Sequence, residues 1–254
     1  MSVKAALGGI ARKILDKYGF RLIRKEYGPF GISVFDDVER IGRAWDLVVR
    51  DVFDVGANVG EFAEEAHRHF PAATVRSFEP HPASFAQLRD RKARPWLVPV
   101  NCALGEVRGE TRMFVYEDSK LNSLVPNAAY AARHGLVPTE MAVRCDTIDD
   151  YCASAAVERV QLLKIDTEGA DLAVLRGARR MLGERRVDFI YVEFNDLLQK
   201  GAVDGGALQP IAEFLAPFGY ECLVSYVDYL VLEMPLFKVC NALFVLPPAT
   251  AKAA

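Results

Sequence analysis

Strands and helices alternate along most of this chain, and this alternation limits its possible folds more than any other feature. Apolar runs of strand length recur from residue 47 onward, and stretches with helical spacing separate several of them. The predicted strands are 47–55, 74–78, 96–100, 160–165, 187–194, 220–227 and 241–246. The predicted helices are 61–70, 83–92, 172–182 and 207–218. This order predicts a doubly wound α/β domain, in which helices cover both faces of a parallel sheet.

Two regions depart from simple alternation. Residues 111–117 and 142–145 are predicted to be additional strands around a long polar loop, 118–141. Loops of this length at an active edge usually serve as lids or substrate loops, so we assign this one to acceptor recognition. The last two apolar runs are joined through residues 228–238 without an obvious crossover helix, which predicts a terminal antiparallel pair.

The N-terminal segment has a different character from the rest of the chain. Residues 1–27 contain seven basic and two acidic residues, although the net charge of the whole chain is −3. Apolar residues at helical spacing over 3–18 predict a basic amphipathic helix that packs as a cap; weak contact with an anionic membrane surface is the alternative. A loop and a helical turn are expected to follow. We therefore divide the chain into a helical cap (1–45), a main domain (46–247) and a tail (248–254).

Composition excludes several classes of protein. The hydrophobic content of 51% and the charged content of 26% are typical of a soluble globular domain, and the net charge is a poor match to nucleic acid. The five cysteines are odd in number and contain no CxxC pair, which indicates neither a disulfide framework nor a zinc site. No uncharged run reaches the roughly 18 residues of a spanning helix, and no export signal is present. We expect a cytoplasmic protein without a transmembrane segment.

A glycine-containing turn follows the first predicted strand. The sequence Asp54-Val55-Gly56-Ala57-Asn58-Val59-Gly60 lets a ligand approach main-chain atoms at the carboxyl edge of the sheet. Glu79 closes the next strand 19 residues after Gly60, where a carboxylate can accept both hydroxyl groups of a ribose. The two features together predict a cofactor that contains adenosine.

Asp54 distinguishes between the candidate cofactors. The turn lacks the third glycine of the dinucleotide fingerprint at residue 61, and a carboxylate close to the turn would repel a pyrophosphate. S-adenosylmethionine, in contrast, carries an ammonium and a sulfonium. We therefore favour this cofactor over NAD; an NAD-dependent oxidoreductase is the alternative enzyme, and a non-catalytic binding module on the same fold is a third possibility.

Several motifs resemble those of the FkbM-type S-adenosylmethionine-dependent methyltransferases. They are Asp54–Gly60, Phe78-Glu79-Pro80, Asn101–Gly105, Asp146–Asp149 and Lys164-Ile165-Asp166-Thr167-Glu168-Gly169-Ala170-Asp171 followed by Gly177-Ala178. The resemblance covers about residues 50–195, and the block that begins at Lys164 is its most specific part. It implies a class I, Rossmann-like methyltransferase fold, whose seven-stranded sheet has an antiparallel last strand. It also implies O-methylation of a sugar, glycolipid or polyketide-type small molecule.

The resemblance also implies roles for individual residues. Asp54 and the glycine turn would hold the methionine end of the cofactor, Glu79 the ribose, and Asn101 to Ala103 the adenine, while Asp166 would face the transferred methyl group. Asp171 departs from the glutamate that is common in the family but keeps its charge. The implied cofactor-binding residues are Asp54, Gly56, Ala57, Asn58, Gly60, Glu79, Pro80, Asn101, Cys102, Ala103 and Asp166.

Carboxylates at the predicted active edge are candidates for catalysis. Methyl transfer from a sulfonium requires an aligned acceptor oxygen and removal of its proton. Asp166 or Glu193 acts as the general base in one scheme; in the other, both carboxylates and Asn195 hold a hard cation. We favour the scheme without a metal. Lys164 shares a strand face with Asp166, which predicts an ion pair. Within the loop, Ser119, Asn122 and Ser123 are the predicted acceptor-binding residues.

Overall fold

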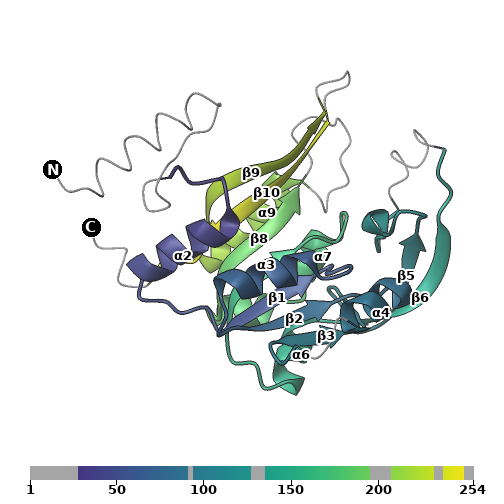
Figure 1. Cartoon of the computed structure of the whole chain (residues 1–254), viewed down its shortest axis with the longest axis horizontal. Coiled ribbons are helices and arrows are strands. Elements are labelled where there is room, and N and C mark those ends of the chain that lie inside the picture. The colour runs from purple at the N-terminus through teal and green to yellow at the C-terminus, as the bar shows by residue number, and fades with distance from the viewer. Residues whose placement is uncertain (1–27, 91–93, 127–134, 195–206, 232–236, 249–254) are drawn as a thin grey trace, which may run out of the picture.

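A central seven-stranded sheet organises the computed structural model, which describes residues 28–90, 94–126, 135–194, 207–231 and 237–248 (Figure 1). Its strands are β1 (Asp51–Val55), β2 (Thr74–Phe78), β3 (Leu97–Val100), β7 (Val160–Ile165), β8 (Val187–Phe194), β9 (Glu221–Val231) and β10 (Phe237–Val245). Their order is β3-β2-β1-β7-β8-β10-β9. All neighbours from β3 to β8 pair in parallel, whereas β10 is antiparallel to both β8 and β9. The predicted fold class, with its antiparallel last strand, is confirmed.

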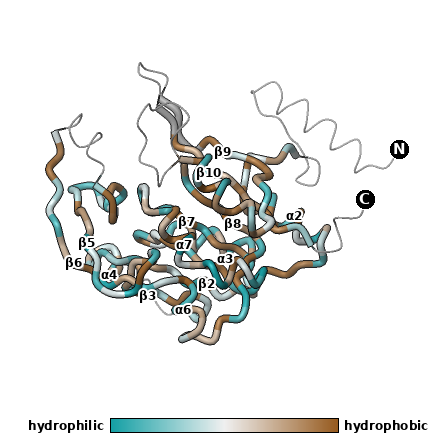
Figure 2. Tube along the Cα trace, turned by 180° about the vertical axis from the view of Figure 1, so that it is seen from behind, coloured by the Kyte–Doolittle hydropathy of each residue, from teal (hydrophilic) through white to brown (hydrophobic). Residues whose placement is uncertain are grey.

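Helices cover both faces of this sheet, and each face has its own apolar core. The helices of one face are α2 (Val34–Ala44) and α3 (Glu61–His69), whereas α6 (Ile148–Ser154), α7 (Asp171–Arg176), α8 (Arg179–Gly183) and α9 (Leu208–Leu215) belong to the other. Strand β8 supplies both cores: Phe189 and Tyr191 face the first, and Ile190 and Val192 the second. Two-sided burial explains its continuous apolar sequence. In Figure 2, brown apolar residues run along the β8 and β10 part of the sheet.

A second, three-stranded sheet lies beside the central one, on the right in Figure 1. Its strands are β4 (Ala103–Leu104), β5 (Gly109–Val115) and β6 (Thr139–Asp146), in the order β4-β6-β5. Both additional strands predicted from the sequence are present with shifted bounds. The loop between them begins with a short 3-10 helix, η2 (Ser119–Leu121), while residues 127–134 lie outside the described part of the chain.

Several predicted boundaries are wrong, for physical reasons. The predicted helix 172–182 is two helices, because Gly177 packs against Gly105: a Cβ at Gly177 would lie 2.0 Å from the Gly105 carbonyl oxygen. The first strand begins at residue 51 rather than 47, where the Gln161 side-chain oxygen accepts hydrogen bonds from the N–H groups of Arg50 and Asp51. Strand β9 ends at Val231 and β10 begins at Phe237, so the connection between them is shorter than the predicted one, 228–238.

Helix α2 replaces the helical turn expected before the first strand. Its N-cap is Ser33, whose side chain accepts a hydrogen bond from the Asp36 N–H. The buried Asp37 carboxylate accepts hydrogen bonds from Gly31 N–H and from the Tyr226 hydroxyl of β9, each at 2.8 Å. Helix α2 is therefore attached to the sheet. The amphipathic helix predicted over 3–18 lies outside the described residues, and among those that are described no helix is long and apolar enough to cross a membrane.

Candidate active site

A cavity of about 350 Å³ opens at the carboxyl edge of the central sheet. Its wall crosses five strands, from Glu79 after β2, past the turn after β1 and Asp166 after β7, to Glu193 in β8 and Asn241 in β10. Open α/β sheets bind ligands at this edge, and the volume is typical of a small-molecule site. The predicted site residues that line it are Gly56, Ala57, Asn58, Glu79, Pro80, Ala103, Ser119, Asn122, Ser123, Asp166 and Glu193.

Four predicted site residues, Asp54, Gly60, Asn101 and Cys102, are described in the structure but do not line the cavity. The Asn101 side-chain amide donates hydrogen bonds to the carbonyl oxygens of Glu79 (2.9 Å) and Pro80 (3.1 Å). Gly60 precedes α3 in a left-handed conformation (φ 87°), and Asp54 and Cys102 are buried. Asn101 thus contacts the lining residues Glu79 and Pro80 through their main chain.

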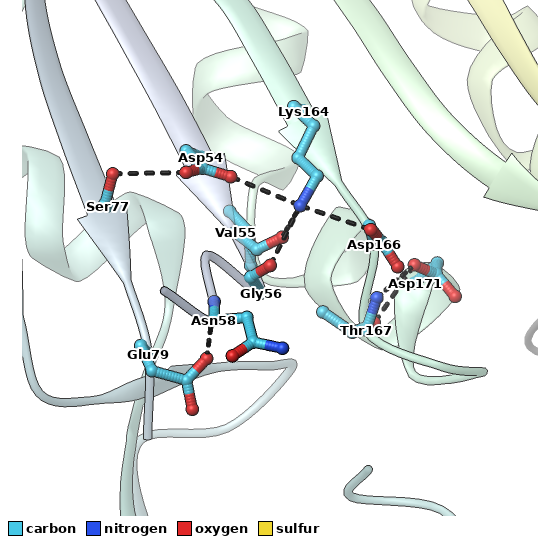
Figure 3. A network of polar contacts seen from close by, with 10 residues as sticks. All are labelled: Asp54, Val55, Gly56, Asn58, Ser77, Glu79, Lys164, Asp166, Thr167 and Asp171. Atoms are coloured by element: carbon cyan, nitrogen blue, oxygen red, sulfur yellow. Dashed lines mark hydrogen bonds and ion pairs between the residues drawn. The ribbon is translucent and has the colours of Figure 1, made fainter. Parts of the chain in front are cut away.

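The Glu79 carboxylate is held by two backbone amides. One oxygen accepts a hydrogen bond from Asn58 N–H and the other from His81 N–H, each at 2.8 Å (Figure 3 shows the first). Burial raises the pKa of Glu79, and the two amides partly oppose this shift. Each oxygen retains a lone pair beyond these bonds, so the fixed carboxylate can accept hydrogen bonds from a ligand's hydroxyl groups.

The turn after β1 can accommodate only glycine at residue 56. Gly56 has φ 75°, and a Cβ there would lie 1.8 Å from the Asp166 carbonyl oxygen. The N–H groups of Gly56 and Ala57 both donate to the carbonyl oxygen of Phe78, at 3.1 and 3.0 Å. The turn therefore connects β2 and β7 closely and exposes main-chain atoms to the cavity.

The Lys164 side chain reaches the turn from β7, and its ammonium lies between Asp54 and Asp166 (Figure 3). Its ammonium lies 3.2 Å from the Asp54 carboxylate and 3.3 Å from that of Asp166, so the predicted pair with Asp166 is present. It also donates hydrogen bonds to the carbonyl oxygens of Gly56 (2.9 Å) and Val55 (3.3 Å). Burial lowers the pKa of Lys164, but the carboxylates of Asp166 and Asp54 outweigh it, and the net shift is upward.

Three carboxylates gather at the other end of the cavity. One oxygen from each of Asp166, Glu168 and Glu193 lies within 4.8 Å of the others, a set that could hold a cation; Asn195 lies outside the described residues. Burial, followed by the nearby Asp166 charge, raises the pKa of Glu168 to about 8 and that of Glu193 well above its usual value. Glu168 was not among the site residues that we predicted from the sequence. Its position within the block that begins at Lys164 is the signal that could have identified it.

The loop that carries Glu168 is held by side chains on both sides. Glu168 has φ 55°, a left-handed conformation that is rare outside glycine. The Asp171 carboxylate accepts hydrogen bonds from the N–H and hydroxyl of Thr167 (both 3.0 Å) and from Gly169 N–H (3.2 Å). On the other side, the buried Ser123 hydroxyl donates to the carbonyl oxygens of Thr167 and Glu168. The loop therefore presents Glu168 to the cavity in a defined conformation.

The sheet order, with β10 reversed between β8 and β9, and the glycine turn after β1 define a class I methyltransferase fold. The family model of the methyltransferase FkbM domain matches residues 54–222, which is more than half of the chain. This chain belongs to that family. The resemblance inferred from the sequence motifs is confirmed.

Curated relatives extend the comparison. The 31-O-demethyl-FK506 methyltransferase FkbM of Streptomyces tacrolimicus is 33% identical over 153 residues, 50% of this chain and 58% of the relative. The hexuronic acid methyltransferase AglP of Haloferax volcanii is 28% identical, over 57% of this chain and 55% of the relative. The 2-O-methyltransferase NoeI of Sinorhizobium fredii is 25% identical, over 57% and 63%. The chain thus matches somewhat more than half the length of these relatives.

Proposed function

We propose that this protein is an S-adenosylmethionine-dependent O-methyltransferase that acts on a hydroxyl group of a sugar, glycolipid or polyketide-type small molecule. The observation that carries the proposal is one cavity with carboxylates at both ends. Glu79, which would accept the hydroxyl groups of a ribose, lies at one end, and Asp166, Glu168 and Glu193 lie at the other. Family membership supports methyl transfer, and the names of two relatives specify oxygen as the acceptor atom in those proteins.

The cavity fits the cofactor at three places. Glu79, oriented by the amides of Asn58 and His81, would accept the ribose hydroxyl groups. Pro80 and Ala103 line the adjoining end, where the adenine would lie, with Asn101 and Cys102 behind them. The open main chain at Gly56, together with Asp166, would receive the amino-acid part. The family match favours this cofactor over NAD, the alternative considered from the sequence.

Glu193 is the better candidate for the general base. When bound, S-adenosylmethionine supplies an electrophilic methyl group. The acceptor oxygen forms its new bond to carbon as the carbon–sulfur bond breaks, and the hydroxyl proton passes to a carboxylate. The Asp166 carboxylate is held by the Lys164 ammonium at 3.3 Å, whereas burial and neighbouring charges raise the pKa of Glu193, so Glu193 binds a proton more strongly than an ordinary glutamate. We therefore assign proton removal to Glu193 and orientation to Asp166.

The charge of this end of the cavity indicates the kind of acceptor. Burial and neighbouring charge raise the pKa values of Glu168 and Glu193, so negative charge is already unfavourable at this end of the cavity, and a further anionic group beside these carboxyls is disfavoured. The aromatic rings of Phe62 and Tyr191 also line the cavity. We propose an uncharged acceptor that places its hydroxyl near Glu193 and contacts Ser119 and Asn122 on the opposite side.

A second scheme uses the same carboxylates differently. A divalent cation held by oxygens of Asp166, Glu168 and Glu193 would lower the pKa of the acceptor hydroxyl, and hard cations prefer such ligands. We favour the scheme without a metal because Lys164 already supplies a positive charge to Asp166.

Calorimetry and a transfer assay test the proposal. S-adenosylhomocysteine is expected to bind to the purified protein, and NAD is not. Isotope-labelled S-adenosylmethionine should then transfer its methyl group to a hydroxyl in a panel of neutral glycans and polyketides, detected by mass spectrometry. Binding of NAD without S-adenosylhomocysteine would refute the proposal, and cofactor binding without transfer to any acceptor class would favour a binding module.

A further inference from the structure

Lys164 is a buried cation whose surroundings are complete without any ligand. An ammonium has three N–H groups, and four oxygens surround this one at 2.9 to 3.3 Å. Only 6% of the residue is exposed. Since the shortest of these contacts is to the Gly56 carbonyl oxygen, Lys164 is tied most closely to the turn that borders the cavity.

The four acceptors belong to different parts of the site. Asp54 pairs with Lys164 in the register of β1 and β7, and it lies behind the cavity wall with no exposed surface. Gly56 and Asp166, in contrast, line the cavity together with Lys164 itself, and the Asp166 side chain is 40% exposed. One ammonium therefore connects a buried carboxylate with two groups that a ligand can reach (Figure 3).

This arrangement changes the role of Asp54. A ligand's ammonium could reach the Asp54 carboxylate only by displacing Lys164 from it. Asp54 therefore pairs with the ammonium of Lys164 and not with a positive charge of the ligand. Two acceptors remain available to the cationic part of a ligand. They are the second lone pair of the Gly56 carbonyl oxygen and the free side of the Asp166 carboxylate, and Lys164 orients both.

We propose that Lys164 is a positioning residue for the amino-acid end of the cofactor: its ammonium, surrounded by four protein oxygens, fixes the Gly56 carbonyl and the Asp166 carboxylate, and its pair with Asp54 holds it in place. The inference rests on the proposed cofactor. It assigns Asp54, which the sequence placed beside the ligand, a supporting position behind Lys164.

Two ligands that differ only in the amino-acid part give a direct test. S-adenosylhomocysteine carries the amino-acid group, whereas 5′-methylthioadenosine has the same nucleoside and sulfur with a methyl group in its place. Removal of Lys164 alone would leave the buried Asp54 carboxylate without a counter-ion and with a hydrogen bond from the Ser77 hydroxyl (3.2 Å), so the variant to compare is Asp54→Asn/Lys164→Met against Asp54→Asn. Both variants have a neutral residue at position 54, and they differ only in the positioning ammonium.

We expect the double variant to bind S-adenosylhomocysteine at least about tenfold more weakly than Asp54→Asn does, the effect of losing one or two oriented polar contacts. Affinity for 5′-methylthioadenosine should agree between the two variants within about twofold, and circular dichroism should show that both are folded. Rescue by Asp54→Asn/Lys164→Arg, which restores a cation, would further support positioning.

Two results would contradict the inference, and a third would contradict the proposed function. Equal affinity of both variants for S-adenosylhomocysteine would overturn the inference, because Lys164 would then be only the counter-ion of Asp54. An equal loss for both ligands would overturn it as well, because the damage would not be confined to the amino-acid end. If the unmodified protein bound neither ligand, the proposed function would fail, and the inference with it.

Discussion

The Ser123 hydroxyl lies 2.8 Å from the carbonyl oxygen of Glu168 and donates a hydrogen bond to it. This contact joins two separate parts of the molecule, since Ser123 follows β5 of the smaller sheet and Glu168 follows β7 of the central one. The loop that carries the carboxylates is thus attached to the loop on the opposite side of the cavity. The position of Glu168 depends on both sheets.

Substitution Ser123→Ala tests this attachment. Two half-buried carbonyl oxygens lose the hydroxyl donor that they share, so we expect a loss of about 1 kcal/mol in the free energy of unfolding, and a larger decrease in kcat than in cofactor affinity. Urea unfolding and steady-state kinetics measure the two effects. Ser154→Ala is the matched control, because the Ser154 hydroxyl also donates to a carbonyl but is exposed. Equal effects of the two substitutions would contradict a role for Ser123 in positioning Glu168.

Substitution Glu79→Ala tests the ribose contact. The N–H groups of Asn58 and His81 lose their acceptor, and the ligand loses its own, so binding of S-adenosylhomocysteine should weaken by about 1–3 kcal/mol. Calorimetry gives the value directly. The exposed Glu158, outside the cavity, provides the control Glu158→Ala. Unchanged affinity in Glu79→Ala would remove Glu79 from the site.

The raised pKa of Glu168 predicts how stability depends on pH. The folded state holds the proton of this carboxyl up to a pKa of about 8, while the unfolded chain releases it near the ordinary value of 4.5. The folded state therefore binds more protons between these values, and its stability decreases as pH rises through this window. Glu168→Gln, which stays neutral, should be more stable than the unmodified protein at about pH 9 and show a smaller difference at about pH 5. Thermal unfolding across this range measures both; a variant that is less stable at the higher pH would refute the assignment.

Substitution Glu193→Gln separates catalysis from binding. Loss of a general base typically reduces the rate by about 10²–10⁴-fold, and we expect this loss in kcat with little change in the dissociation constant of S-adenosylhomocysteine. The pH profile of kcat should also lose its acidic limb, because that limb reports the ionisation of the base. A rate within a few-fold of the unmodified enzyme would exclude Glu193 from proton transfer.

Chelation distinguishes the two catalytic schemes. With Lys164 beside Asp166 and a side chain acting as base, transfer activity should survive extensive dialysis against EDTA. Activity that disappears on dialysis and returns with Mg²⁺ or Mn²⁺ would instead assign Asp166, Glu168 and Glu193 to a cation. The EDTA-treated protein should retain its thermal midpoint, which separates loss of a metal from loss of folding.

The sequence predicted the centre of the sheet well because burial on both faces leaves a clear pattern. The bounds of β7 and β8, which are buried at nearly every residue, agree with the predicted strands at both ends, and so do those of β2, although β2 is buried only in part. The break between α7 and α8 was not predictable in this way. It depends on the approach of Gly177 to the Gly105 carbonyl, a contact between residues far apart in the sequence.

The two ion pairs of Lys164 differ in the same way, because one could be predicted from the sequence and the other could not. The pair Lys164 and Asp166 follows from the two-residue period of a strand and was predicted. The pair Lys164 and Asp54 was not, because it depends on the register between β1 and β7. Without that register, Asp54 was placed beside the ligand. Local spacing and the resemblance to the family together identified the residues of the site, and strand pairing determined that Asp54 does not reach the cavity.

The hydrogen bond between Asp37 and Tyr226 connects residues 189 positions apart, and this separation affects how the chain folds as it is synthesised. Helix α2 leaves the ribosome before any strand of the central sheet. Its anchor on β9 and the apolar residues Leu243 and Val245 of β10, which share its core, are synthesised after all the other strands of the central sheet. The first described helix can therefore complete its packing only after β9 and β10 have emerged. Until then, Phe35 and Val38 lack part of their cover, and the nascent chain exposes apolar surface that the folded protein buries.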